Sequence, residues 1–346
     1  MTNLSIIIKD KWSLYRYRNY LYKYLNKNYS LNKLILYNNP ISQNNSLIKI
    51  IYRMNSYIFK KRKVQMIHLI FSVRVIVLVG LVCFFYKKKH IFIANFTGLG
   101  FSFIESGLKN KFLKLIVKIC LLNYQYAIVQ NEIDKIEIRK IFKKKIFITH
   151  GSGYKFQDYS YKKFLNKKKI NILFASRFIF NKGIDDLIKI IELADKAKFF
   201  FNINFITDYT NADTCDRNTL IKLKSFKNTN IILNKNLKIN DYLKNDYFLC
   251  LSYREGLPRV LLESINFGLP ILAYDVAGVG ELVNKDTGYK FPSRKYIRLL
   301  KKLNEITFFS TPRISKKLSK NIIDPYSEEN VLKEYISIIN NVKNSF

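Results

Sequence analysis

The sequence is poor in acidic side chains and rich in basic ones. Its 346 residues hold 25 Asp and Glu against 60 Lys and Arg, which gives a formal net charge of +35. Residues 1–150 alone carry 27 basic and 5 acidic side chains. Such an excess favours an anionic partner, which is nucleic acid, an anionic membrane or a phosphorylated substrate. An AT-rich coding sequence also raises the Lys content, and it explains part of the charge without any partner.

Cysteine and histidine are scarce, which argues against a zinc site. The four cysteines stand far apart, no Cys-x-x-Cys pair occurs, and there are three histidines. Scattered cysteines among apolar neighbours indicate reduced thiols and a cytoplasmic protein. The first residues, MTNLSIIIKDKW, lack the pattern of a secretory signal peptide. An Asp-x-Asp metal motif is absent as well, so we expect neither a metal nor a cofactor.

One apolar run is long enough to cross a bilayer. It extends from Met66 to Tyr86. His68 and Arg74 lie within it, and an Arg near the centre of a spanning helix costs at least ~2.5 kcal/mol. The alternative, which we favour, is a buried strand near residues 64–70 followed by a helix near residues 72–86.

Short apolar runs alternate with helical patterns along the whole chain, which predicts an α/β protein with parallel sheets. The length favours two domains. We expect an N-terminal Rossmann-like domain over residues 1–165, a second over 166–322, and a C-terminal helix within 323–346 that packs back toward the first domain. The charged stretch Tyr161–Lys169 is the expected linker.

The most informative stretch is YREGLPRVLLESINFGLPILAYD, residues 253–275. It follows the apolar run YFLCLS and predicts a strand, a loop, a helix and another strand. Pro258 suits the first helical position, Gly268 suits the helix end, and Pro270 prevents its continuation. The helix then begins at the carboxyl end of a parallel strand, where free backbone N–H groups can hold a phosphate.

These residues resemble the donor-binding signature of the family-4 glycosyltransferases of the GT-B fold. The Glu-x(7)-Glu pattern of that family is complete at Glu255 and Glu263, and FASRFIFNKG resembles its Arg-x(4)-Lys-Gly element at Arg177 and Lys182. FTGLGF, residues 96–101, is similar to a glycine loop in the branch that builds capsule, lipopolysaccharide or protein-glycan precursors on lipid carriers. The resemblance implies two Rossmann-like domains whose parallel sheets face each other across a cleft.

The resemblance also implies a function and a role for each matching residue. The implied reaction is a retaining, metal-independent transfer from a nucleotide-diphosphate sugar, with UDP as the default, to a polyprenyl-diphosphate-linked or glycan acceptor. Arg177 and Lys182 would stabilise the leaving diphosphate, together with the N-terminus of the helix at 257–267. Glu263 would accept hydrogen bonds from the ribose hydroxyls. Glu255, beside Gly256 and Leu257, would meet the transferred sugar.

Each role has a structural alternative. Arg177 and Lys182 could be solvated surface charges, Glu263 could pair with Arg259 four residues earlier, and Glu255 could pair with Arg254.

The N-terminal half offers fewer candidates. Gly98 and Gly100 would let the backbone approach the diphosphate, or they form an ordinary turn. We expect His68 to be structural or near the acceptor, and His90 to lie at the surface. TDYTNAD and ILNKNLK replace a Gly-Asp-Gly turn and a Phe-x-Gly element of the family, which leaves the nucleotide base open.

Two other functional classes remain. One is a non-catalytic partner that keeps the GT-B fold, and the other is a basic nucleic-acid-binding protein, against which the lack of a recognisable reading motif argues. For the enzyme we expect peripheral attachment to the inner face of the cell membrane. Basic runs at Lys60–Lys63, Lys87–Lys89 and Lys143–Lys145 would meet anionic lipids.

Overall fold

The chain forms two compact units. The structure is a computed structural model, and it describes residues 3–10, 14, 18–37, 47–60, 65–82, 90–100, 103, 107–159, 169–198, 201–208, 217–233, 237–308 and 313–344. Unit 1 comprises Met1–Lys155 with Pro325–Phe346, and unit 2 comprises Phe156–Asp324. The sequence placed the boundaries after residues 165 and 322, whereas unit 2 begins at Phe156 and ends at Asp324. Most of the expected linker, residues 161–168, lies outside the described residues.

Unit 1 is built on a six-stranded parallel sheet in the order β2-β1-β3-β4-β5-β6. Its strands are β1 (Asn3–Asp10), β2 (Ser30–Tyr37), β3 (Met66–Phe71), β4 (His90–Asn95), β5 (Tyr126–Val129) and β6 (Ile146–Ile148). Its helices are α2 (Asn19–Asn28), α3 (Leu47–Lys60), α4 (Val73–Val82), α5 (Leu108–Leu121), α6 (Glu132–Arg139) and α13 (Glu328–Lys343).

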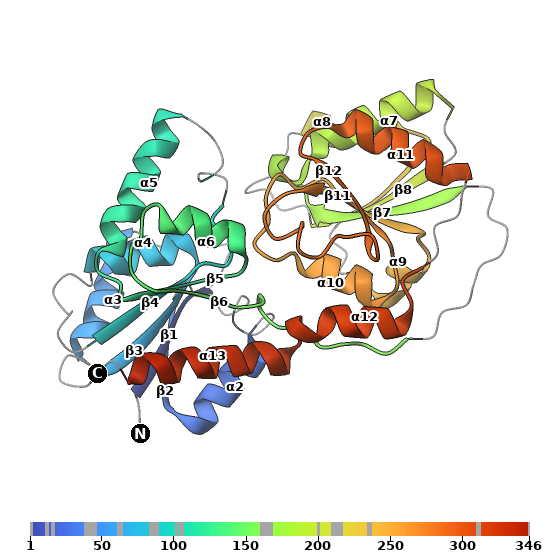
Figure 1. The fold of residues 1–346 in the computed structure, drawn as a ribbon. Helices are drawn as coiled ribbons and strands as arrows, with labels where there is room; N and C mark the ends of the chain where they lie inside the picture. Colours follow the sequence, from blue (N-terminus) through green and yellow to red (C-terminus); the bar gives the residue numbers. More distant parts are fainter. Residues whose placement is uncertain are drawn as a thin grey trace. The chain divides into compact units, whose positions relative to one another are not determined.

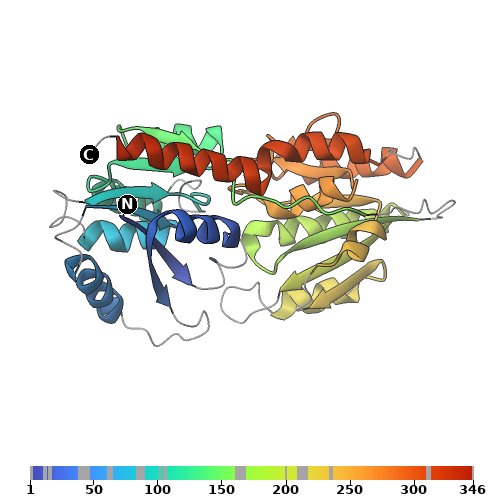
Figure 2. The ribbon, with the colours of Figure 1, turned by 90° about the horizontal axis from the view of Figure 1, so that it is seen from below.

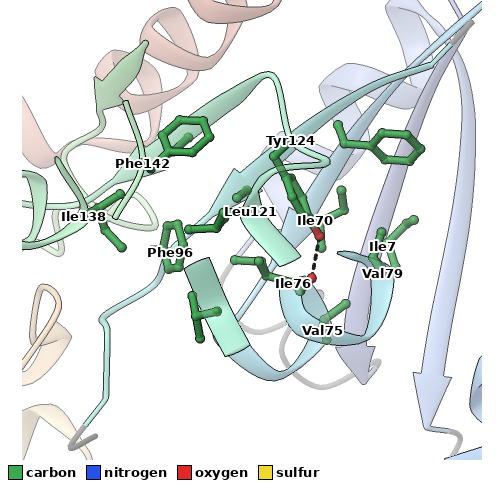
Figure 3. Packing of buried hydrophobic residues seen from close by; sticks show 14 of the residues in the cluster. Ile7, Ile70, Val75, Ile76, Val79, Phe96, Leu121, Tyr124, Ile138 and Phe142 are labelled. Atoms are coloured by element: carbon green, nitrogen blue, oxygen red, sulfur yellow. Dashed lines mark hydrogen bonds between the residues drawn. The ribbon is translucent and has the colours of Figure 1, made fainter. Parts of the chain in front are cut away.

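Helices cover both faces of this sheet because its strands alternate between two apolar faces. Ile7, Ile70 and Phe92 point into a core with residues of α3 to α6. Figure 3 shows part of this core, in which the Tyr124 hydroxyl donates a 2.7 Å hydrogen bond to the carbonyl oxygen of Ile76. The alternate strand residues pack against α2 and α13, which lie on the other side of the sheet (Figure 1).

The C-terminal helix α13 is part of unit 1. Ser327 caps it by accepting a 3.2 Å hydrogen bond from the backbone N–H of Asn330, as the sequence predicts for a Ser at this position. Val331 and Tyr335 on its buried side are no more than 1% exposed. Figure 2 views unit 1 from the side that α13 covers.

Unit 2 has a second six-stranded parallel sheet, in the order β12-β11-β10-β7-β8-β9. The strands are β7 (Ile170–Arg177), β8 (Phe201–Asp208), β9 (Thr229–Leu233), β10 (Tyr247–Cys250), β11 (Ile271–Asp275) and β12 (Gly288–Pro292). The helices are α7 (Ile184–Lys196), α8 (Arg217–Ser225), α9 (Ile239–Leu243), α10 (Arg259–Asn266), α11 (Tyr296–Phe308) and α12 (Lys316–Ile323). Two short 3-10 helices are η3 (Phe180–Lys182), in unit 2, and η4 (Asp324–Tyr326), where the chain returns to unit 1.

These observations confirm the predicted α/β class with parallel sheets, and β10, α10 and β11 are the strand, helix and strand predicted around residues 253–275. The apolar run Met66–Tyr86 begins with β3 and α4, as the favoured interpretation predicted. No helix in the described part of the chain combines the length and the apolar character that crossing a bilayer requires.

Helix α10 begins at Arg259, so Pro258 is its N-cap and not its first residue. Gly268 ends it with a φ of +71°, which is the left-handed conformation expected of a terminal glycine.

Candidate active site

The candidate residues of unit 2 gather at one edge of its sheet. Strands β7 and β10 are neighbours and run parallel. From β7 the chain goes on to β8 on one side, and from β10 it goes on to β11 toward the opposite edge of the sheet. The carboxyl ends of two such strands form the switch point at which open α/β sheets bind ligands. Arg177 ends β7 and is exposed. Lys182 lies in η3 five residues later, and Glu255 lies in the loop that follows β10.

Three loops pack backbone against backbone at this edge. The N–H of Tyr253 donates a 3.0 Å hydrogen bond to the carbonyl oxygen of Asn181, which joins the loop after β10 to η3. Gly183 has a φ of +74°, and a Cβ at its position would lie 2.3 Å from the carbonyl oxygen of Leu251. Only glycine satisfies both conditions.

The loop after β11 meets the same segment. The N–H of Glu255 donates a 3.3 Å hydrogen bond to the carbonyl oxygen of Ala277. Gly278 has a φ of +74°, and a Cβ there would come within 1.9 Å of the carbonyl oxygen of Gly256. The loop that holds Glu255, Gly256 and Leu257 is therefore positioned in part by the loop that follows β11.

Lys182 and Glu255 form an ion pair at the centre of this arrangement. Their side chains are 17% and 16% exposed, so water screens the pair less than it screens a surface pair. Cys250 lies below it at the end of β10. Burial raises the pKa of the Cys250 thiol to about 11, and the negative charge of Glu255 contributes to the rise. This thiol is protonated at neutral pH and is a packing group, not a nucleophile.

Glu263 lies on α10, and both of its oxygens have partners. The hydroxyl of Tyr242 donates a 2.5 Å hydrogen bond to Oε2, and Nε of Arg259 lies 3.3 Å from Oε1. The pair with Arg259 that the sequence offered as an alternative is therefore present. Each carboxylate oxygen can accept two hydrogen bonds, so these contacts leave acceptor capacity for a ligand hydroxyl.

A second group of side chains, which the sequence did not indicate, holds the start of the Glu255 loop. The Tyr274 hydroxyl donates a 2.8 Å hydrogen bond to Asp186 at the start of α7. The rings of Tyr274 and Tyr253 stack with centroids 6.3 Å apart, and the Arg294 guanidinium lies 4.6 Å from the Tyr253 centroid. Burial, followed by the charge of Asp186, raises the pKa of Tyr253. Tyr253 is thereby fixed two residues before Glu255.

Gly98 and Gly100 belong to unit 1, where they follow the carboxyl end of β4. Both have left-handed φ values, of +101° and +74°. Among the described residues, no atom lies within 4 Å of a Cβ added at Gly100, so the described surroundings leave this backbone open on one side. Arg177, Lys182, Glu255 and Glu263 belong to the other unit.

Two histidines of unit 1, His68 and His90, form a buried chain of hydrogen bonds with Ser5. Ser5 Oγ lies 2.5 Å from Nδ1 of His68, and Nε2 of His68 lies 2.9 Å from Nδ1 of His90. Burial lowers the pKa of His68 to about 3. His90 is 2% exposed, so its predicted surface position is wrong. It opens β4, a central strand that helices cover on both faces. Among the described residues, no group of three His, Cys, Asp or Glu could hold a metal ion.

A family model matches the part of the chain that forms unit 2. Residues 155–324 match the family described as glycosyl transferases group 1. Unit 2 thus carries a glycosyltransferase group 1 domain. Narrower assignments, including family 4 and the glycine loop of its surface-glycan branch, stay predictions.

Two curated relatives share part of the sequence. An uncharacterized 41.2 kDa protein in the cps region of Klebsiella pneumoniae is 33% identical over 120 residues, which are 35% of this chain and 32% of that protein. The amylovoran biosynthesis glycosyltransferase AmsD of Erwinia amylovora is 30% identical over 118 residues, 32% of either chain. The alignments thus span about a third of the length of these relatives.

Solved structures show the same fold over the whole chain. A sucrose-phosphate synthase from Thermosynechococcus elongatus matches with a TM-score of 0.75 and 12% identity, covering 100% of both chains. HepE of Anabaena, solved in complex with UDP, matches with a TM-score of 0.68 and 10% identity, covering 99% of this chain and 100% of that one. At these identities the likeness shows the GT-B fold alone.

Proposed function

We propose that the protein is a retaining glycosyltransferase of surface-glycan biosynthesis. It transfers a sugar from a nucleotide-diphosphate sugar, with UDP as the expected nucleotide, to a polyprenyl-diphosphate-linked or glycan acceptor. The observation that carries the proposal is the Lys182–Glu255 ion pair between the loops that follow β7 and β10. It puts a cation and a carboxylate together at the edge of the sheet where this class of fold binds its ligands.

The cations supply what a departing diphosphate needs. Lys182 and the exposed Arg177 follow the same strand, and both would stabilise the negative charge that grows as the glycosidic bond breaks. The eight-residue helix α10 begins just after the Glu255 loop, and its free N–H groups add positive potential. With these groups in place the transfer needs no divalent metal.

The carboxylates would recognise the rest of the donor. In the absence of a ligand, Glu255 neutralises Lys182. A bound diphosphate would take over Lys182 and leave Glu255 to accept hydrogen bonds from the sugar hydroxyls. Glu263, held by Tyr242, would accept from the vicinal ribose hydroxyls.

The relatives support the choice of donor and pathway. AmsD is named for the biosynthesis of amylovoran, and the Klebsiella relative is named for a cps region. HepE was solved with UDP. For this chain, UDP, a lipid-linked or glycan acceptor and a place at the inner face of the cell membrane are therefore proposals. Gly98 and Gly100 remain candidate donor contacts of unit 1.

Thermal unfolding with nucleoside diphosphates tests the donor directly. UDP at ~100 times its Kd should add about 2.7 kcal/mol to stability, with or without a chelator of divalent ions. ADP and GDP serve as the comparison for the base. No stabilisation by any nucleotide, or stabilisation only with a divalent ion, would contradict the proposed site.

Transfer assays then test the two cations. Arg177→Ala and Lys182→Ala should each lower kcat about 30- to 900-fold, which corresponds to the ~2–4 kcal/mol of a lost charge-stabilising donor. Arg217→Ala and Lys196→Ala, at exposed positions in the same unit, are matched controls that should keep activity. The anomeric configuration of the product, read by NMR, decides whether the transfer retains or inverts.

A further inference from the structure

Helix α5 of unit 1 carries an apolar face that no described part of the chain covers. Five large apolar side chains are more than half exposed, with exposures of 87%, 62%, 51%, 54% and 64%: Leu108, Phe112, Leu115, Ile119 and Leu122. At about 100° per residue they fall within an arc of about 80° on one side of the helix. Contiguous exposed apolar surface of this kind marks an interaction site.

The opposite side of the same helix holds it on unit 1. Val117, Cys120 and Leu121 are buried, and the helix packs so closely against α4 that a Cβ at Gly80 would lie 2.6 Å from Cβ of Cys120. The exposed face is therefore not a poorly packed core surface, because α5 already has a buried side. In Figure 1 the first turns of α5 stand clear of the other helices of unit 1.

The charge around the face identifies its partner. Helix α5 contains four lysines and no Asp or Glu, and its lysines are Lys109, Lys111, Lys114 and Lys118. They flank the apolar stripe instead of interrupting it. The exposed basic run at residues 143–145 lies nearby, since Nζ of Lys144 is 3.4 Å from the carbonyl oxygen of Leu122 at the end of the helix.

We propose that this face of α5 docks unit 1 onto an anionic lipid bilayer. An apolar stripe between lysines is the pattern of a helix that lies in the membrane interface, with its apolar side among the acyl chains and its lysines among the lipid head groups. Each Lys near an anionic surface strengthens the attachment. The proposal needs no step of the sugar transfer, and vesicle binding is measured without donor or acceptor.

Vesicle co-sedimentation of the full chain tests the apolar part. The probe is phosphatidylcholine vesicles with about 30% phosphatidylglycerol. The triple variant Leu108→Gln, Phe112→Gln and Leu115→Gln should lose at least about tenfold in binding, because binding scales with buried apolar area, while Gln preserves the helix. Ile133→Gln with Ile136→Gln is the matched control, on exposed positions of α6, and should bind like the wild type.

A second set of variants tests the charge. Lys109→Gln, Lys111→Gln and Lys118→Gln together should lower binding to the anionic vesicles at least tenfold and reduce the difference between anionic and pure phosphatidylcholine vesicles. Lys224→Gln with Lys227→Gln, on exposed positions of unit 2, should change neither. Equal binding of wild type to both vesicle types would overturn the anionic lipid as partner.

Fluorescence locates the face at the bilayer. In Phe112→Trp, tryptophan emission should shift to shorter wavelength with anionic vesicles and be quenched by lipids brominated in their acyl chains. The matched variant Ile221→Trp, on exposed α8 of unit 2, should show neither change.

Two results would overturn the proposal. The first is that the apolar triple variant binds vesicles as tightly as the wild type does. The second is a wild-type protein that forms a dimer and does not bind vesicles, together with a triple variant that is a monomer. That result would assign the face to a second copy of the chain.

Discussion

The Lys182–Glu255 pair allows a double-mutant cycle that measures both stability and function. Lys182→Met and Glu255→Gln each leave one charge at a site where the side chains are 17% and 16% exposed. Breaking a fully buried pair costs 3–5 kcal/mol and breaking an exposed one costs 0.2–1 kcal/mol, so we expect about 1–3 kcal/mol for each single change. The double variant removes both charges, and the coupling energy should be about 1–2 kcal/mol.

Urea denaturation of the wild type, the two single variants and the double variant gives these free energies from the transition midpoints. The comparison requires that the dependence of unfolding free energy on urea concentration is the same in all four proteins. The matched control is the pair of Lys302 and Glu305 on α11, whose side chains are 26% and 62% exposed. Its cycle should give a coupling energy below about 0.5 kcal/mol, as for other helical surface pairs.

Calorimetry with UDP adds the functional side of the cycle. Lys182→Met should weaken UDP binding at least about tenfold, on the scale of a lost charged hydrogen bond. Glu255→Gln should not weaken it, because the change removes the competitor of the diphosphate for Lys182. Additive stability effects, or equal loss of UDP binding in both single variants, would refute the reasoning.

Three further predictions concern other residues. Glu263→Gln should weaken UDP binding about tenfold but leave pyrophosphate binding unchanged in calorimetry, and Tyr242→Phe should cost ~1 kcal/mol of stability. Gly278→Ala should cost about 2–4 kcal/mol and slow transfer, whereas Gly100→Ala, at the same φ but with no atom within 4 Å of its Cβ, should cost only ~1–2 kcal/mol. Burial holds the pKa of His68 at about 3 in the folded protein, against 6.5 when unfolded, so the free energy of unfolding should fall as pH is lowered below 6.5. By pH 5 the loss is ~2 kcal/mol. Urea denaturation at pH 7 and pH 5 should show this loss in the wild type and not in His68→Gln; the same loss in both proteins would refute His68 as its cause.

Several elements of both units could be predicted because their signals are local. Helix α7 follows from the spacing of Ile184, Leu187, Ile188 and Ile191, all of which are buried. The start of α13 follows from the capping side chain of Ser327. Such signals need only a few neighbouring residues, and tertiary structure did not override them here.

The contacts of the candidate site depend instead on strand order. Lys182 and Glu255 are 73 positions apart, and they meet because β7 and β10 are neighbours. Tyr242, on α9, donates a hydrogen bond to Glu263, on α10, 21 positions later in the chain. Residue spacing suggested which residues matter, but it carries no information on such pairings. As the structural alternative for Glu255 the sequence offered an ion pair with its neighbour Arg254, while the structure pairs Glu255 with Lys182.

Helix α5 shows a different limit of sequence patterns. Periodicity marks an apolar stripe, but it does not tell a stripe that packs on a core from one that faces outward. Helix α5 carries both, with Val117 and Cys120 buried and Phe112 and Ile119 exposed. Only the packing of α4, at Gly80, against Cys120 of α5 distinguishes them. Of the basic runs that the sequence singled out, residues 61–63 of Lys60–Lys63 and all of Lys87–Lys89 lie outside the described residues.

The path of the chain also constrains how unit 1 is made. One face of its sheet, with Leu4, Ile6 and Ile67, is covered partly by Val331 and Tyr335 of α13. These residues are made only after all of unit 2 has been synthesised. Domains generally fold as units during synthesis, so unit 2, which is continuous over Phe156–Asp324, can complete its core first. Unit 1 must keep an apolar sheet face open until the last helix arrives. The catalytic candidates lie in unit 2 and the proposed lipid-binding helix α5 lies in unit 1, so point substitutions should separate nucleotide binding from vesicle binding. Truncating the C-terminus is not an equivalent experiment, because it removes α13 and uncovers the sheet of unit 1.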